Sequence, residues 1–158
     1  MKQTKISVLL ASLMAAGFMM SGQAMAAEDS ATTTVTILAP ITVSDTQNMS
    51  FGTVVRDTIS KTVTETTPAI FTVGGTVGAT YSFAITATDL TGGGGDPMPL
   101  SAFTAAKGAT PLDGSEPNFT STLGNATEDV TVGATLTVGA EQVAGTYTGT
   151  ITATVNYN

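Results

Sequence analysis

Apolar and polar residues alternate without interruption over fourteen positions, from Gly145 to Asn158. Threonines and Asn156 occupy one face, and a period of two over this length predicts a half-buried β-strand. We expect the strand to run to the last residue, which leaves one edge for pairing with a further strand. The apolar face comprises Tyr147, Ile151, Ala153, Val155 and Tyr157.

A second alternating segment spans residues 32–43. Its apolar face comprises Val35, Ile37, Ala39, Ile41 and Val43. Pro40 lies on the other face, and because proline has no N–H for a sheet ladder, this strand is expected at a sheet edge or broken at Pro40. Met49 and Phe51 continue the pattern as far as a turn at Gly52.

The rest of the chain predicts an all-β fold. Further strands are expected at residues 58–64, 69–73, 80–88 and 128–138, separated by glycine-rich turns, and no helical period is found after residue 26. About seven short antiparallel strands are typical of an immunoglobulin-like, pilin-like β-sandwich, with a closed barrel as the alternative. Residues 89–127 are predicted to be loop-rich, in the manner of a long hairpin excursion.

The first 26 residues have the features of a signal peptide. Lys2 and Lys5 precede an apolar run at residues 6–20, and the small residues Ala24 and Ala26 provide a cleavage site. Residues 27–158 then form a single sandwich domain, with residues 27–43 as an N-terminal strand. We expect export to the periplasm, the cell surface or the extracellular space, with no transmembrane segment after cleavage.

Composition excludes several classes of function. After cleavage three basic residues face twelve acidic ones, a net charge of −9 that disfavours nucleic acid and anionic lipid as partners. The chain has no cysteine and no histidine, which removes most nucleophile–base pairs, and neither a metal nor a cofactor is expected. Threonine, at about a quarter of these residues, suits exposed strand faces.

Two carboxylate pairs are the remaining candidates for catalysis. Asp89 with Asp96, and Glu128 with Asp129, could in principle serve a glycosidase, but they fall in or beside predicted turns and the chain has no tryptophan to stack on a sugar. Residues 89–96 could also be read as a calcium loop, although the spacing favours a flexible glycine loop. We therefore expect no enzymatic activity.

Two motifs resemble the ends of a known family. Residues 136–157 read LTVGAEQVAGTYTGTITATVNY, and residues 34–41 and 49–54 read TVTILAPI and MSFGTV. They resemble the closing and opening motifs of a bacterial family of exported domains catalogued as domain of unknown function 4402. The resemblance spans nearly all of residues 27–158 and is weakest in the middle.

The closing strand also resembles those of chaperone–usher pilins and spore-coat U domains, in which a tyrosine is penultimate, as Tyr157 is here. In such pilins an immunoglobulin-like fold lacks its final strand, and an extension from the next subunit fills the groove. The resemblance implies a homopolymer, or a periplasmic chaperone and usher, as partners. Many pilins carry a disulfide, and this chain has no cysteine.

Strand pairing is therefore the main functional hypothesis: a non-catalytic fimbrial or surface-layer subunit that assembles by β-strand addition. Donor or first-strand anchors would be Val35, Ile37, Ile41 and Val43, and the acceptor edge would comprise Tyr147, Ile151, Val155 and Tyr157. Burying the apolar face of residues 32–43 would contribute roughly 5–12 kcal/mol gross. Whether this segment pairs with its own chain or with a neighbour is left open.

The alternative is a secreted or surface module that binds glycan or protein through residues 89–127. Phe103 and Phe119 would be its contact residues. Lone aromatic residues of this kind more often fill a core.

Overall fold

The computed structural model describes residues 27–158. The predicted signal peptide lies outside the described residues. Residues 36–158 form one compact unit, and residues 27–41 contain no strand. Among the described residues there is no helix long and apolar enough to span a bilayer.

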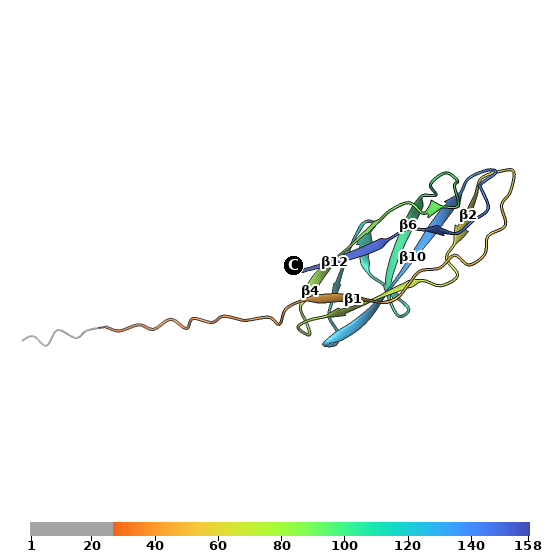
Figure 1. Cartoon of the computed structure of the whole chain (residues 1–158). Helices are drawn as coiled ribbons and strands as arrows, with labels where there is room; N and C mark the ends of the chain where they lie inside the picture. The colour runs from red at the N-terminus through yellow and green to blue at the C-terminus, as the bar shows by residue number, and fades with distance from the viewer. Residues whose placement is uncertain (1–26) are drawn as a thin grey trace, which may run out of the picture. The chain divides into compact units, whose positions relative to one another are not determined.

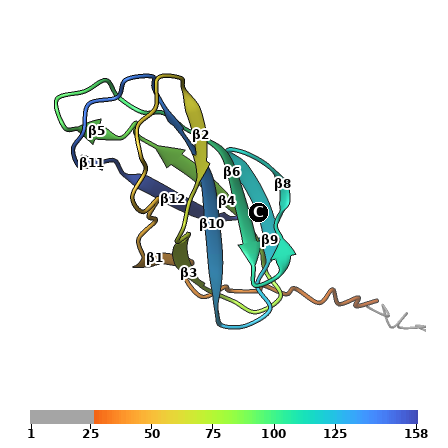
Figure 2. The same ribbon diagram turned by 90° about the vertical axis from the view of Figure 1, so that its right-hand side faces the viewer.

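The strands form two antiparallel sheets that pack face to face, plus a two-stranded ribbon (Figures 1 and 2). The first sheet has the order β1 (Thr42–Gln47), β3 (Ala69–Gly74), β10 (Thr127–Val138), β6 (Leu100–Lys107) and β7 (Thr110–Pro111), and β2 (Lys61–Thr64) pairs with the second half of β10. The second sheet has the order β12 (Ile151–Tyr157), β4 (Thr80–Ala87), β9 (Asn118–Thr122) and β8 (Asp113–Ser115). The ribbon pairs β11 (Tyr147–Thr148) with β5 (Thr91–Gly92).

The predicted all-β sandwich is confirmed, and the closed-barrel alternative is wrong because the described sheets keep free edges. Alternating side chains of the central strands fill the space between the sheets. Those of β3, β4 and β10 are the most completely buried, as their residues point inward at every second position. The largest fully buried side chains are Tyr81, Phe83, Ile85, Leu123, Val73, Val130 and Val132.

Residues 89–127, which were expected to be loop-rich, contain more strand than expected. This segment holds β5, β6, β7, β8 and β9, so that residues 27–158 contain twelve strands instead of about seven. Alternation is obscured in β6, where Ala102 has a φ of 51° and the pairing with β10 shifts register between Gly133 and Thr135. Such a bulge brings two successive residues to the same face and breaks the period of two.

The closing strand is also not continuous. Tyr147 and Thr148 pair with β5, whereas β12 begins at Ile151 in the other sheet. At the break, the hydroxyl of Thr88 accepts the N–H of Thr150 at 2.9 Å, where a regular ladder would use a carbonyl. A Cβ on Gly149 would lie 2.9 Å from the carbonyl oxygen of Thr88, so a residue without a side chain is needed here.

A half-buried carboxylate supports β10 where its partner strands change. β3 pairs with β10 up to Val132 and β2 pairs from Thr135 onward, which leaves the residues between them without a partner on this side. Glu65 fills the gap by accepting the N–H of Ala134 at 3.0 Å. A Cβ on Gly133 would lie 2.6 Å from the Glu65 carboxylate, so a glycine there makes room for it.

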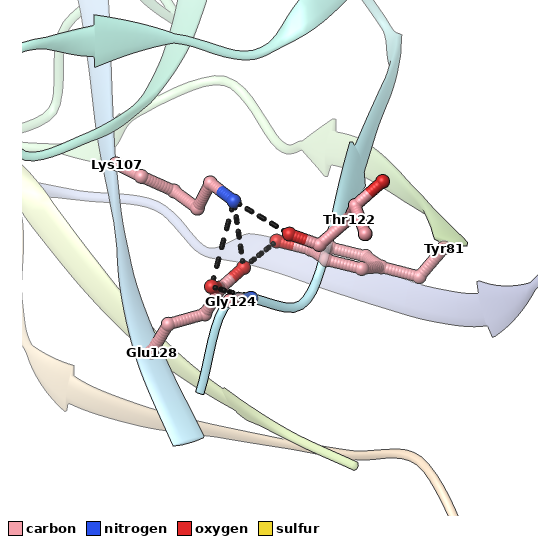
Figure 3. A network of polar contacts seen from close by, with 5 residues as sticks. All are labelled: Tyr81, Lys107, Thr122, Gly124 and Glu128. Carbon is pink, nitrogen blue, oxygen red and sulfur yellow. Dashed lines mark hydrogen bonds and ion pairs between the residues drawn. The ribbon is translucent and has the colours of Figure 1, made fainter. Parts of the chain in front are cut away.

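A polar network connects the two sheets (Figure 3). The Tyr81 hydroxyl of β4 donates to Glu128 of β10 at 2.8 Å, and Lys107 of β6 lies 3.2 Å from the same carboxylate. The Lys107 ammonium also donates to the Thr122 carbonyl at 2.7 Å, and the N–H of Gly124 donates to Glu128 at 3.1 Å. Glu128 is therefore a structural residue of the sandwich, held by donors from both sheets.

Alkaline conditions should weaken this network. Burial, followed by the hydrogen bond and charge of Glu128, raises the pKa of Tyr81 well above its usual value of about 10. The unfolded chain loses this proton first, so the free energy of unfolding should fall above pH 10, by up to about 1.4 kcal/mol per pH unit. Tyr81→Phe should show a shallower fall in denaturant unfolding followed by circular dichroism.

The two proteins are compared by how steeply the free energy of unfolding falls with pH, not by its absolute value. Tyr81→Phe also loses a hydrogen bond, which lowers the free energy of unfolding by about 1 kcal/mol at neutral pH. Between pH 7 and pH 9 the two proteins should differ by a constant amount. Equal slopes above pH 10 would contradict the assignment of Tyr81 as an alkaline-sensitive tie between the sheets.

An open strand edge as the candidate functional site

The outer edge of β12 carries backbone groups without partners in the described chain. At the start of β12 the N–H of Thr88 donates to the Thr150 carbonyl at 2.9 Å, and at its end the N–H of Asn158 donates to the Thr80 carbonyl at 3.1 Å. Antiparallel strands bond through alternate residues, so the even-numbered residues of β12 bond to β4 and the odd-numbered ones direct N–H and C=O outward. We call these four residues the β12 edge. They are Ile151, Ala153, Val155 and Tyr157.

The same four residues carry the apolar side chains of β12, and these are only half-buried. They contrast with Tyr81 and Phe83 on the neighbouring β4, whose exposed fraction is 0%. On the opposite side of the sandwich the chain crosses from β7 to β8 at Leu112, which is buried and donates its N–H to Ala105. The described chain has no such crossing between β12 and β1, so the core is less covered on this side.

β1 forms the other margin of this side. It approaches β12 without pairing with it. The N–H of Gly75 donates to the Ala126 carbonyl at 3.0 Å, and these two residues continue the pairing of β3 with β10. Because alternate residues of an antiparallel strand bond to the same neighbour, the backbone groups of Val73 also face β10, whereas those of Gly74 face β1. Val43 lies opposite Val73, and its backbone groups therefore point away from β3, to the free side of β1.

An open cavity of about 630 Å³ lies at the start of β12. Segment 49–56 and segment 142–151 form much of its wall, and β10 and Leu90 contribute apolar side chains. The side chain of Arg56 also lines it and forms an exposed ion pair with Glu141 at 3.7 Å. Ile151 lines the cavity and begins the β12 edge, so the two features are continuous. Its apolar lining residues include Met49, Phe51, Met98, Leu136, Val138 and Tyr147.

Tyr147 is held at this cavity by a hydrogen bond to Val143 and by close packing against the glycine-rich loop. Its hydroxyl donates to the Val143 carbonyl at 2.9 Å. Gly93 has a φ of 60°, and a Cβ there would lie 2.8 Å from the Tyr147 ring. The loop that could have been a calcium site is therefore explained by close packing against Tyr147, which needs glycine.

Tyr157 has a polar role at the far end of the β12 edge. Its hydroxyl donates to the Ala39 carbonyl at 2.9 Å and accepts the N–H of Thr76 at 2.8 Å. The Thr76 hydroxyl accepts the N–H of Ala39 at 2.7 Å. A Cβ on Gly75 would collide with the Tyr157 hydroxyl, so glycine is required there. We call Tyr157 and Thr76 together the Ala39 hook.

The hook was not predicted from sequence. Tyr157 was expected among the edge residues and Ala39 on the apolar face of residues 32–43, but no contact between them was expected, and Thr76 had no predicted role at this site. Tyr157 lies 118 residues from Ala39 and 81 from Thr76 along the chain. Contacts at such separations leave no local pattern.

The predicted donor residues separate into two groups. Ile41 and Val43 are half-buried and pack against the chain's own core, and Val43 pairs within β1. Val35 and Ile37 have exposed fractions of 84% and 87% and pack against nothing in the described chain. The strand expected over residues 32–43 is wrong for most of its length, since residues 27–41 form no strand and β1 starts at Thr42, after Pro40. β1 lies at the edge of its sheet, as one of the two interpretations of Pro40 predicted.

The other candidate residues serve the fold. Phe119 is buried in the core and Phe103 packs against it, so neither is an exposed loop contact. Asp129 accepts the hydroxyl of Thr72 at 2.6 Å. Within residues 27–158 no three acidic side chains gather into a metal-binding group.

Comparison with known proteins gives one match. The family model described as "Domain of unknown function (DUF4402)" matches residues 22–157. No curated protein and no solved structure matches the chain.

The two faces of β12 should respond differently to an added charge. Ile151→Asp places a carboxylate against the core and the cavity wall, and should lower the free energy of unfolding by about 2–3 kcal/mol. Thr152→Asp adds the same charge on the exposed face of the same strand and should change it by less than about 0.5 kcal/mol. Chemical unfolding followed by circular dichroism measures both, and equal losses would contradict the assigned register.

Proposed function

The chain belongs to the DUF4402 family, and from the open edge of β12 we propose that it is an exported, non-catalytic structural subunit that assembles by β-strand addition. One observation carries the proposal. The backbone groups without partners and the half-buried apolar side chains occur on the same four residues of β12. An added strand with one apolar face satisfies both at once, whereas a loop or a small polar ligand satisfies neither.

The cost of an uncovered edge supports this proposal. Free strand edges promote aggregation, and proteins usually protect them with charge, proline or a covering segment. β12 has no charged residue and no proline, and its exposed face consists of Thr152, Thr154 and Asn156. The edge therefore lacks the usual protection, which favours a dedicated partner strand.

We assign residues 32–38 of a second copy as that strand. Val35 and Ile37 are two positions apart, so in an extended strand their side chains lie on one face and can insert beside the β12 edge. Burying these two side chains contributes about 3–6 kcal/mol gross. This is less than the five-residue estimate from sequence, because Ile41 and Val43 already pack in their own core.

The wider proposal places the protein outside the cytoplasm, in a fimbria or a surface layer. Export follows from the signal peptide predicted from the first 26 residues. A periplasmic chaperone and an outer-membrane usher would cover the edge before assembly and deliver subunits in order. The binding-module alternative loses the aromatic residues that motivated it, because Phe103 and Phe119 pack with the core.

Charge on the donor segment should separate assembly from folding. Val35→Asp with Ile37→Asp alters two exposed side chains, so residues 27–158 should fold with unchanged thermal stability and remain monomeric. Thr34→Asp with Thr36→Asp is the matched control, with the same added charge on the other strand face, and should still associate. Light scattering at several protein concentrations measures both; assembly of both variants alike would contradict the assigned donor face.

A truncated protein provides a second test. Residues 39–158 keep the whole of β1 and should bind a peptide of residues 27–38. At a peptide concentration one hundred times the dissociation constant, binding should stabilise the truncated protein by about 2.7 kcal/mol. A peptide with aspartate at positions 35 and 37 should not stabilise it. A truncated protein whose melting temperature is unchanged by saturating peptide would overturn the proposed function.

A further inference from the structure

The β12 edge could in principle be covered by the chain's own residues 32–38. β1 begins at Thr42, and its free side lies next to β12. A hairpin at residues 39–41 would return residues 32–38 along β1, antiparallel to it, and bring them beside β12. Such a chain would complete its own sandwich and would have no edge to offer a neighbour.

Two features around Ala39 oppose this hairpin. Both backbone polar groups of Ala39 are already bonded: its N–H donates to the Thr76 hydroxyl and its carbonyl accepts from Tyr157. A hairpin that reverses the chain at residues 39–41 would have to break these bonds, because they hold Ala39 against the turn between β3 and β4. The hook lies at the end of the β12 edge itself, since Tyr157 belongs to both.

The local sequence also lacks the residues that tight hairpins need. Two-residue hairpin loops require a positive φ, which glycine or asparagine adopts most readily. Residues 27–51 contain no glycine, and Ala39 does not have a positive φ. Pro40 fixes its own φ near −65°, which excludes it from the positive-φ positions of such a loop, and it disfavours the helical region for Ala39 before it.

The geometry points to a positioning function for the Ala39 hook. Tyr157 and Thr76, together with Pro40, keep residues 32–38 from pairing with the β12 edge of their own chain. The β12 edge is thereby left free for a second copy of the chain. This inference rests on the proposed function and adds how the choice between self-pairing and partner-pairing is made. Thr36, Ile37 and Leu38 are all exposed directly before the hook.

The test removes the hydrogen bonds of the Ala39 hook and introduces a sequence that favours a hairpin. One variant of residues 27–158 carries Tyr157→Phe and Thr76→Val, which remove the three hydrogen bonds of the hook. A second variant adds Ala39→Asn and Pro40→Gly, which introduce a favoured two-residue hairpin turn. Ser82→Ala is the control, because it removes a side-chain hydrogen bond to Asn156 of 3.3 Å without touching the hook.

Two measurements give the result. Hydrogen exchange of dilute monomers reports whether the amides of residues 33–38 are protected, and light scattering on concentration reports association. The wild type and Ser82→Ala should leave these amides unprotected and should associate. In the monomer of the four-substitution variant, the amides of residues 33–38 should exchange at least tenfold more slowly than in the wild type. This variant should also need at least tenfold higher protein concentration to associate, and the two-substitution variant should give intermediate values for both.

The outcomes separate this inference from the proposed function. If all variants associate like the wild type with unprotected amides, the hook has no positioning role, although strand addition between copies stands. If the wild-type monomer already protects residues 33–38, the chain completes itself and the inference is wrong. A wild type that stays monomeric with unprotected amides overturns the proposed function, and the hook inference fails with it.

Discussion

The hydrogen-bond phase of the ladder between β4 and β12 is the constraint on which the site depends. Bonds at Thr150 and Asn158 fix which residues face β4, and the alternation of an antiparallel strand then directs every odd-numbered residue outward. Those residues also point their side chains at the core. Any cover for this edge must therefore be a strand with apolar side chains, because it has to meet both requirements along the same line.

The sandwich can sustain an uncovered side because its other parts are tied together. The Tyr81–Glu128–Lys107 network joins the two sheets, and Leu112 covers the core where the chain crosses between them. β10 provides the centre of the larger sheet, with Glu65 bonded where its partners change. The domain is thus held together at its middle and on one side, and the side at β12 and β1 has no such tie in the described chain.

Several features followed from local pattern, and several did not. The shared face of Ile151, Val155 and Tyr157 could be predicted because successive side chains of a strand alternate between its two faces. The strands within residues 89–127 were not, because a bulge near Ala102 and short pairings of two or three residues remove the period on which such reasoning depends. The alternation over residues 32–43 did not distinguish Val43, which pairs with β3, from Val35 and Ile37, which stay exposed, because an alternating pattern is the same whatever the partner of the strand.

The sequence by itself determined an all-β chain, the apolar face of its closing strand, the edge position of the strand that follows Pro40 and the family to which the chain belongs. These depend on side-chain period, on the missing N–H of proline and on motifs read along the chain. Only the tertiary structure decided that β12 has a free outer edge and that Tyr157 bonds to Ala39. It also decided that Val43 pairs with β3 of its own chain while Val35 and Ile37 stay exposed. The reason is physical: which edge remains unpaired depends on how every other strand has found its neighbour, and those pairings join residues far apart in the chain.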